Sequence, residues 1–376
     1  MRPASEAEKA RLAETFVALC RIDSTFTRER ACADRVIAEL AGMGVGVEED
    51  DAGRELGGDC GNLLARIPGR SDRTVLLCAH LDTVEATAPI EPVLVDGGWE
   101  NANDGILGAD NKAAVAVMLE IARRARIEGS PVGIELLLTV GEENALAGAK
   151  CFDRDRLTAA FGYVFDHASP IGEVVVASPT YFRLRADFHG RAAHAGIRPE
   201  DGRSAVLAAA RAITAMPHGR IDDQTTANVG SVHGGVGSTN VVPERATLLA
   251  EARSLDPSRA EDVVARMIDA VQDAAGATEC DVDTTVEQLF TGYRARPSSP
   301  AVAAAEAALT ECGYTPRRIS TGGGSDANVL EAAGLPCVNL ANGTERNHQP
   351  DERVSVVALE GMLDVGLALL DAAAEA

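Results

Sequence analysis

Short apolar runs alternate with amphipathic stretches through the first half of the chain. Asn62–Ile67, Thr74–Ala79 and Gly133–Val140 are apolar runs of strand length, and the last two are apolar enough to be buried on both faces of a sheet. Tyr163–Phe165 is a shorter run. Between them, Lys112–Arg126 repeats apolar residues three and four positions apart, which predicts a helix. Alternating strands and helices predict an α/β domain with a mostly parallel, mixed sheet and helices on both faces.

The middle of the chain has a different pattern. Apolar and polar residues alternate strictly from Phe182 to His189, which predicts a strand with one face in water. The pattern then predicts a helix near 201–216 and strands near 225–233 and 246–254. A helix capped by Ser258 follows near 258–275, and a strand near 281–288. The resulting order β-α-β-β-α-β is that of the split-βαβ, ferredoxin-like α+β domain.

The alternation of strands and helices then resumes. Helices are predicted over 300–312, from Asp326, and over 355–375, and strands over 316–320 and 336–341. The simplest interpretation is one α/β domain, residues 1–177 and 293–376, which is interrupted by an inserted α+β domain, residues 178–292.

Charge and composition narrow the classes of function. The chain has 376 residues, with 35 Lys or Arg against 57 Asp or Glu, so its formal net charge is −22. We expect no nucleic-acid or membrane partner, because binding to phosphates and to anionic lipid relies on basic patches. No run approaches the ~18 apolar residues of a membrane span, and the N-terminal stretch lacks the apolar core of a secretory signal. Eight scattered cysteines without a CxxC pair predict reduced thiols, and hence a cytoplasmic location.

Residues that can bind metal stand just past several of the apolar runs, where open α/β sheets place their sites. His80 and Asp82 follow Thr74–Ala79, and positions i and i+2 of an extended chain face the same way. The Asp82 carboxylate can therefore hold the second ring nitrogen of a metal-ligating His80. A surface turn with an incidental contact between the two residues is the alternative.

Acidic residues at two further places have alternative explanations. Asp110 precedes the predicted helix, either as its N-cap or as a carboxylate that bridges two cations. Glu142 and Glu143 follow the run Gly133–Val140. Adjacent glutamates often belong to a solvated turn, but here one of them can ligate a metal while the other takes a proton from water.

Two more candidate ligands complete the pattern. Asp166 follows a short apolar run, with His167 beside it as a competing ligand, and His348 follows the strand predicted over 336–341, where a lone histidine is often incidental. If Asp110 bridges, two sets of three ligands arise: His80, Asp110 and Asp166; and Asp110, Glu143 and His348. Each set leaves an open position, as catalytic zinc requires. Ligands of this kind fit two zinc ions, with cobalt or manganese as alternatives.

Seven segments resemble the dinuclear-zinc exopeptidase family that contains peptidase T, carboxypeptidase G and succinyl-diaminopimelate desuccinylase. They are AHLDT, GILGADNKAA, TVGEENALAGAK, FDHASPIGEVVVASPT, GRAAHAGIRPEDGRSA, GSTNVVPERATLLAEARS and GGGSDANV. The resemblance covers nearly the whole chain and is closest to the peptidase T-like branch. It implies that the metal ligands are His80, Asp110, Glu143, Asp166 and His348, with Asp110 bridging. It further implies that Asp82 orients His80, that Glu142 is the general base, and that the bond after Asp110 is cis.

The same resemblance implies that the inserted domain is a lid, which in many members also forms the contact of a homodimer. His194 would help to polarise the substrate carbonyl, from its own subunit or from the partner. Asn240 and Arg253 would bind polar groups of the substrate. His233 has no assigned role, and Gly322–Gly324 is interpreted as a loop that permits close backbone approach.

The resulting hypothesis is a metal-dependent exopeptidase that hydrolyses small peptides, of the tripeptide aminopeptidase type. An N-acyl amino acid amidohydrolase or carboxypeptidase on the same scaffold is the alternative, and Arg253 fits both because arginine binds carboxylates well. A non-catalytic metal-binding protein is a further alternative. The pair Glu142 and Glu143 favours an enzyme, because a metal buffer needs no spare carboxylate beside a ligand.

Overall fold

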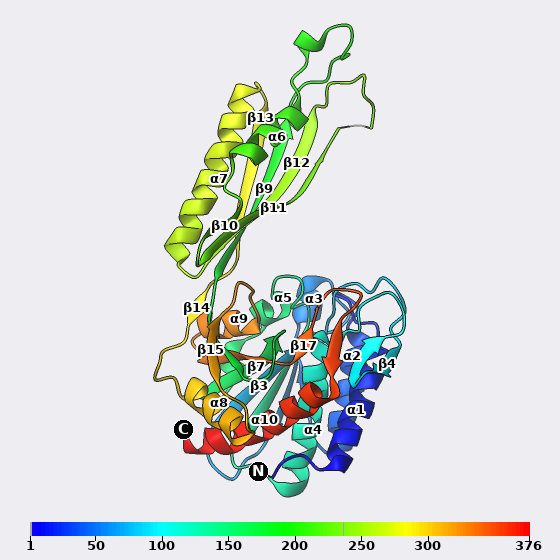
Figure 1. The fold of residues 1–376 in the computed structure, drawn as a ribbon, viewed down its shortest axis with the longest axis vertical. Coiled ribbons are helices and arrows are strands. Elements are labelled where there is room, and N and C mark those ends of the chain that lie inside the picture. The colour runs from blue at the N-terminus through cyan, green and yellow to red at the C-terminus, as the bar shows by residue number, and fades with distance from the viewer. Residues whose placement is uncertain (1, 236) are drawn as a thin grey trace. The chain divides into compact units, whose positions relative to one another are not determined.

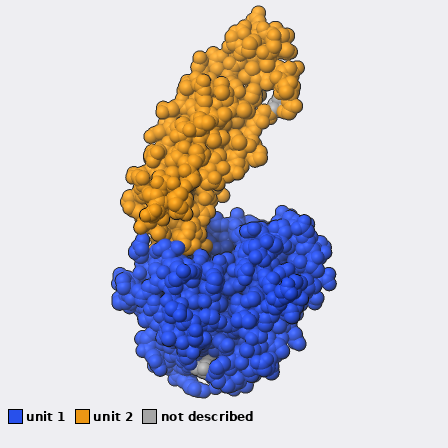
Figure 2. All heavy atoms as spheres, viewed as in Figure 1, with its two compact units in different colours: residues 1–177, 294–320, 325–376 blue, residues 178–293, 321–324 orange. Residues whose placement is uncertain are grey.

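The computed structural model describes residues 2–235 and 237–376. The chain divides into two compact units, which Figure 2 colours separately. Unit 1 comprises the residues up to 177 together with 294–320 and 325–376, and unit 2 comprises 178–293 and 321–324. Unit 2 is therefore an insertion into the chain of unit 1.

The centre of unit 1 is a mixed sheet, and its strand order within the described residues is β1-β2-β6-β3-β7-β16-β8-β14, with β15 beside β8. The middle strands β6, β3, β7 and β16 run parallel to one another. Strand β1 pairs antiparallel with β2, β2 with β6, and β8 with β16. The prediction of a mostly parallel, mixed sheet is therefore confirmed. The strands are β1 (Val47–Glu49), β2 (Leu63–Ile67), β3 (Thr74–His80), β6 (Gly133–Thr139), β7 (Phe161–His167), β8 (Glu173–Ser178), β14 (Tyr293–Arg294), β15 (Arg317–Ser320) and β16 (Cys337–Ala341).

Helices cover both faces of this sheet (Figure 1). Successive residues of a strand point to opposite faces. On β3, Leu77 and Ala79 belong to the apolar core that includes α4, whereas Cys78 faces the other way and contacts Asp326 at the start of α9. No helix among the described residues combines the length and the apolar character of a membrane span. The helices are α1 (Glu6–Cys20), α2 (Arg30–Gly42), α3 (Ala52–Leu56), α4 (Ala109–Glu128), α5 (Ala147–Cys151), α8 (Pro300–Glu311), α9 (Asp326–Ala332) and α10 (Val356–Glu375).

A small second sheet in unit 1 has the order β17-β18-β5-β4. Its strands are β4 (Pro92–Val95), β5 (Gly98–Asn101), β17 (Thr344–Glu345) and β18 (Arg353–Ser355). The sheet joins the hairpin β4–β5 to the hairpin β17–β18, which are far apart in the sequence. The pattern of apolar residues did not predict it, because these strands are short and all but β4 carry a charged residue.

Unit 2 has an antiparallel sheet in the order β10-β11-β12-β9-β13 with two helices packed on it. Every second residue of β9 is buried, so the helices cover one face and the other face remains accessible. The predicted split-βαβ arrangement is confirmed, with β10 as an additional short strand. The cap of the second helix differs from the prediction: Asp256 is the N-cap, and its carboxylate accepts the Ser258 amide N–H. The elements are β9 (Thr180–His189), α6 (Ala205–Ala215), β10 (Gly219–Asp222), β11 (Thr225–Gly234), β12 (Arg245–Ser254), α7 (Pro257–Ala277) and β13 (Asp281–Phe290).

A buried ion pair joins α1 to α4. The Arg124 guanidinium donates from Nε and Nη2 to the two carboxylate oxygens of Glu8, both at 2.7 Å, and only 2% and 6% of the two residues are exposed. Glu8 also accepts the backbone N–H of Ser5, which closes the first turn of α1. The hydrogen bonds from Arg124 hold the pKa of Glu8 well below its ordinary value.

We predict that Glu8→Gln lowers the free energy of unfolding by about 3–5 kcal/mol at pH 7, because it leaves the Arg124 charge buried and unpaired. A carboxylate whose pKa is lowered by folding stabilises the folded state at every pH above the ordinary pKa of a glutamate. This stabilisation is lost as the pH falls through the pKa of the folded state. The difference between wild type and variant should therefore shrink from pH 5 downward, as measured by urea denaturation. Glu6→Gln, an exposed change in the same turn, should alter stability by no more than about 0.5 kcal/mol. Equal losses in the two variants would contradict this account.

Candidate active site

The predicted metal ligands of unit 1 lie at one edge of the sheet. Strands β6, β3, β7 and β16 are parallel neighbours about 4.8 Å apart, so their carboxyl ends share this edge. His80 ends β3, Asp166 stands near the end of β7, Glu143 follows β6, and His348 follows β16. Asp110 comes from the first turn of α4, which packs against β3 and β7. The strand order thus brings together residues that are far apart in the sequence.

Asp110 lies between two groups of side chains. His80 Nε2 is 3.4 Å from Asp110 Oδ1 and 3.4 Å from Asp166 Oδ1. On the other side, His348 Nε2 is 3.2 Å from Asp110 Oδ2 and 2.7 Å from Glu143 Oε1. The two oxygens of one carboxylate therefore face two different sets of donor atoms. Glu142 also approaches His80 and Asp166 closely enough for all three to hold one ion.

The chemistry of these donor atoms fits bound cations. His80 Nε2, Asp110 Oδ1 and Glu143 Oε1 are buried and have no hydrogen-bond partner among the described residues. Buried polar atoms are normally paired, and an unpaired one costs about 1–3 kcal/mol. Asp166 Oδ1, by contrast, accepts a hydrogen bond from Asn111 Nδ2 at 3.3 Å. Converging imidazole and carboxylate groups of which several lack partners are typical ligands of a divalent metal such as zinc.

The electrostatics lead to the same conclusion. Burial and the neighbouring charge of Asp166 raise the pKa of Glu142 well above its ordinary value, and burial likewise raises the pKa of Asp166. Burial alone would lower the pKa of His80, but the carboxylates of Asp166, Asp110 and Asp82 reverse this and raise it. Asp110 and Glu143 raise the pKa of His348 to about 10. The carboxylates thus repel one another in the absence of a cation and attract positive charge.

Asp82 holds its neighbours differently from the prediction. The hydrogen bond of His80 Nδ1, at 2.9 Å, goes to the backbone carbonyl of Asp82, whereas the carboxylate oxygen Oδ1 is 3.4 Å away. Because a carbonyl only accepts, Nδ1 carries the proton and Nε2 is free to face Asp110. The Asp82 carboxylate instead accepts the backbone N–H groups of Glu142 and Glu143, at 3.0 and 3.1 Å. It thereby holds the turn that carries both glutamates.

The backbone around Asp110 bears on the two alternatives of a helix cap and a metal-binding carboxylate. Gly108, in the left-handed conformation, precedes α4, and the helical backbone is interrupted at Asp110 and Asn111, whose φ and ψ are not helical. The Asp110 carboxylate faces other side chains instead of capping: Oδ1 has no hydrogen-bond partner among the described residues, and Oδ2 lies 3.2 Å from His348 Nε2. The peptide bond between Asp110 and Asn111 is cis, as the family resemblance implied.

Three buried carboxylates near the site were not predicted. Glu352 accepts the backbone N–H groups of Leu107, Gly108 and Asp110, and Glu29 accepts that of Gly141. Burial raises the pKa of Glu352 and of Glu29 to about 7. Asp326 accepts the Thr139 hydroxyl through Oδ2, and its Oδ1 is buried without a partner in the described part of the chain. All three stand in charged or glycine-rich segments, where sequence patterns carry no sign of burial.

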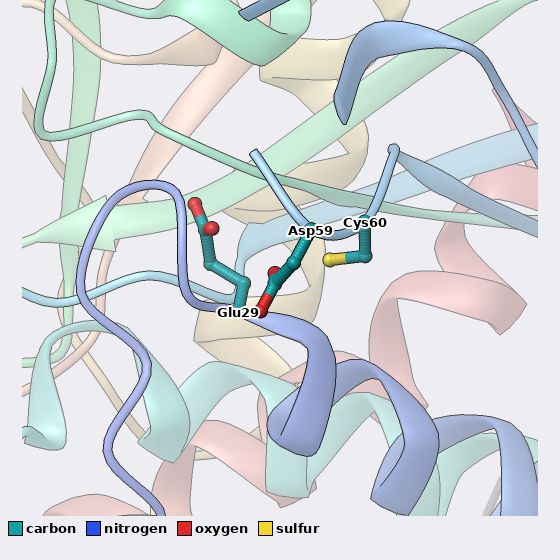
Figure 3. Close-up of side chains that lie close together, drawn as sticks. All are labelled: Glu29, Asp59 and Cys60. Atoms are coloured by element: carbon teal, nitrogen blue, oxygen red, sulfur yellow. The ribbon is translucent and has the colours of Figure 1, made fainter. Parts of the chain in front are cut away.

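A second group of possible ligands, Glu29, Asp59 and Cys60, lies near the start of α2 (Figure 3). Its carboxylates already have partners: Glu29 accepts from Gly141, and the exposed Asp59 accepts the backbone N–H of Arg30 at 2.9 Å. Burial raises the pKa of the Cys60 thiol above its ordinary value, which disfavours the thiolate that binds metal. This group therefore lacks the unpaired acceptors that distinguish the cluster around Asp110.

His167, the competing ligand, is directed elsewhere: its Nε2 is 3.9 Å from Glu173 Oε2. The lid residues belong to unit 2. His194 is exposed and pairs with Val241, and its Nδ1 accepts the backbone N–H of Gly196 at 3.2 Å. Asn240 lies beside His194, since the backbone carbonyl of Asn240 accepts the backbone N–H of Ala195.

Arg253 stands at the other end of strand β12. Its guanidinium lies 4.0 Å from the centre of the Tyr181 ring and bonds to the Glu251 carboxylate and the Gly322 carbonyl. The glycine loop permits close approach, because a Cβ on Gly324 would lie 2.2 Å from the Phe290 ring. The structure thus groups His194 with Asn240 and separates both from Arg253. His233 is an exposed residue of β11.

The chain is similar to known peptidases. Residues 62–173 match the profile of peptidase family M28, and residues 178–279 match that of the peptidase dimerisation domain of the M20 peptidases. The protein YqjE of Bacillus subtilis, whose function is uncharacterised, is 37% identical over 97% of this chain and 99% of its own length. Peptidase T of Pectobacterium carotovorum is 25% identical over 69% of this chain and 64% of its own length.

Two solved structures resemble the chain over nearly its full length. Aminopeptidase PepT from Bacillus cereus is 38% identical, with a TM-score of 0.87, over 97% of this chain and 99% of that protein. A tripeptidase from Staphylococcus aureus is 33% identical, with a TM-score of 0.92, over 98% of this chain and 99% of that protein.

We predict that zinc stabilises the metal-free protein, and that Asp110→Ala abolishes the effect. Free ligand at 100 times its dissociation constant should add about 2.7 kcal/mol to the free energy of unfolding. Thermal melting with and without added zinc checks this, with the metal content measured in parallel. Asp59→Ala, in the group of Figure 3, should respond to zinc as wild type does. A loss of the response in Asp59→Ala alone would place the metal in that group instead.

Proposed function

This chain belongs to the dinuclear metal exopeptidase family that includes peptidase T, and we propose that it removes the N-terminal residue from small peptides, above all tripeptides. The names of the two similar structures, an aminopeptidase and a tripeptidase, support the choice of substrate. The observation that carries the proposal is the carboxylate of Asp110, whose two oxygens face His80 and His348, with Glu142 close to His80 and Asp166.

The proposed ligands follow from the distances around Asp110. His80, Asp110 and Asp166 would hold one cation, and Asp110, Glu143 and His348 would hold the second. Zinc is favoured because the donors are imidazole and carboxylate groups, with cobalt or manganese as alternatives. The His348 side chain is 47% exposed, so the second position is accessible from solvent.

The chain's own groups divide the steps of peptide hydrolysis among them. Two divalent cations at this site would polarise the scissile carbonyl and bring the pKa of a water molecule near neutrality. Glu142 takes the proton of the attacking water and then delivers it to the leaving amine. The Asp82 carboxylate fixes the turn of Glu142 through its amide, while the Asp82 carbonyl fixes the His80 ring. His194 accepts a hydrogen bond at Nδ1, so the neutral ring carries its proton on Nε2 and can donate it to the substrate carbonyl oxygen.

A homodimer joined through unit 2 is part of the proposal. Between Arg245 and Arg253, strand β12 extends about 27 Å, and His194 pairs with the chain beyond the Arg245 end. An extended tripeptide spans only about 10 Å. His194 and Arg253 of one chain therefore cannot both contact the same tripeptide, so two copies must contribute if both residues bind it. The match of residues 178–279 to a peptidase dimerisation domain supports this arrangement.

We also propose a cytoplasmic location. All eight cysteines are free thiols, and six of them are buried. Unpaired thiols persist in a reducing compartment.

We predict that Glu142→Ala keeps its metal and loses about 10²–10⁴-fold in kcat, because only the proton transfer is removed. Glu143→Ala, the adjacent glutamate, should instead lose metal together with activity. Metal analysis and steady-state kinetics of both purified variants check this contrast. Near-normal turnover in Glu142→Ala would refute the assignment of the base.

The substrate class is tested with a panel of free di-, tri- and tetrapeptides, N-acetylated tripeptides and N-acyl amino acids. The proposal expects the highest kcat/KM for tripeptides with a free amino terminus. Preference for N-acyl amino acids would make the protein an amidohydrolase on the same scaffold, and no amine release from any substrate by the zinc-loaded protein would favour a non-catalytic metal-binding role.

Complementation tests the contribution of the second copy. His194→Ala and Glu142→Ala should each be nearly inactive alone. When the two are co-expressed, random pairing makes half of the dimers mixed, each with one complete site, so activity should recover to about a quarter of wild type. A mixture no more active than either variant alone would mean that His194 acts within its own chain.

A further inference from the structure

We infer that Glu352 is a positioning residue for the proposed reaction: it holds the backbone that presents the bridging carboxylate of Asp110 to both cations. The inference rests on the metal site proposed above and goes beyond it, because Glu352 is neither a ligand nor the proton acceptor. Three backbone amides converge on this one side chain.

The contacts of Glu352 occupy both of its oxygens. Oε2 accepts the N–H groups of Leu107 and Gly108, both at 2.8 Å, and Oε1 accepts that of Asp110 at 2.9 Å. Only 2% of Glu352 is exposed. These amides stand just before and at the interruption of the helical backbone at Asp110 and Asn111, where no side chain of the N-cap residue bonds to them. Glu352 supplies the missing acceptors from a segment about 240 residues later in the chain.

Glu352 also ties Asp110 to the other proposed ligands. It stands four residues after His348, in the loop that connects the strands β17 and β18. This loop is compact: the Glu352 N–H bonds to the Gln349 carbonyl, and Arg346 pairs with Asp351.

One loop therefore approaches Asp110 at two points, through the proposed ligand His348 and through Glu352. His348 Nε2 lies 3.2 Å from the Asp110 carboxylate, and Glu352 accepts from the Asp110 amide. A shift of the amide would move the carboxylate away from one or both sets of ligands. Groups that orient metal ligands in this way typically affect metal affinity or activity by about 10–100-fold.

The test is Glu352→Gln, whose amide nitrogen cannot accept the N–H that one carboxylate oxygen now receives. We expect zinc affinity, measured by competition with a fluorescent chelator, and kcat each to fall about 10–100-fold, while KM changes less than about 3-fold. The visible spectrum of the cobalt-loaded variant should also differ from that of wild type. Glu352→Asp keeps both acceptor oxygens on a shorter side chain and should show smaller losses of the same kind.

Glu135 offers a matched control away from the site. It is 1% exposed and accepts the backbone N–H groups of Thr158 and Ala159, so Glu135→Gln removes a similar buried acceptor. This variant should lose stability but keep the zinc affinity and cobalt spectrum of wild type.

Wild-type zinc affinity, kcat and cobalt spectrum in both Glu352 variants would overturn the inference and leave the proposed function intact. Equal loss of metal affinity in Glu135→Gln would also overturn it, because the effect would then come from general destabilisation. If wild type itself binds no metal and releases no amine from peptides, the proposed function fails, and this inference fails with it.

Discussion

The crowding of carboxylates at one buried edge of a sheet is the constraint on which this site depends. Each buried negative charge needs compensation, and the structure provides it in two ways. Asp82, Glu29 and Glu352 receive backbone N–H groups. Asp110 and Glu143 keep buried oxygens without a hydrogen-bond partner among the described residues. Unpaired buried oxygens thus distinguish Asp110 and Glu143 from Asp82, Glu29 and Glu352, whereas Asp166, the third proposed carboxylate ligand, accepts from Asn111.

The two kinds depend on each other. The turn with Glu142 and Glu143 is held by Asp82, and the turn before it by Glu29 through Gly141. The start of α4 is held by Glu352 in the same manner. Loops at the carboxyl ends of parallel strands have few backbone partners of their own, because the strand ladder has ended. Buried carboxylates take the place of that ladder, so the proposed ligands are held on fixed backbone.

The fold and the position of the site follow from local patterns in the sequence, but the supporting residues do not. Apolar runs such as Thr74–Ala79 and Gly133–Val140 predict buried parallel strands, and polar residues just past them share an edge of the sheet whatever the loops do. The acceptors Glu29 and Glu352 stand in the segments RER and DER, which look like solvated surface. Their burial depends on long-range packing, as between Glu352 and the start of α4. The actual contacts of the Asp82 carboxylate were missed for the same reason: they depend on where β6 ends.

On the proposed assignments, the division of the chain into two units would separate the chemistry from the selection of substrate. Every group proposed to bind metal or to transfer the proton belongs to unit 1, and the proposed substrate-binding residues His194, Asn240 and Arg253 belong to unit 2. Within unit 2, the span of strand β12 keeps His194 far from Arg253, so one copy does not present both to a tripeptide. The accepted peptide length would then depend on the spacing between two copies of unit 2. This spacing sets the distance between the contacts that His194 and Arg253 make with the peptide, and the metal centre does not. Changes within unit 2 can thus alter the accepted peptide length while the carboxylates of unit 1, and the hydrolysis they support, stay the same.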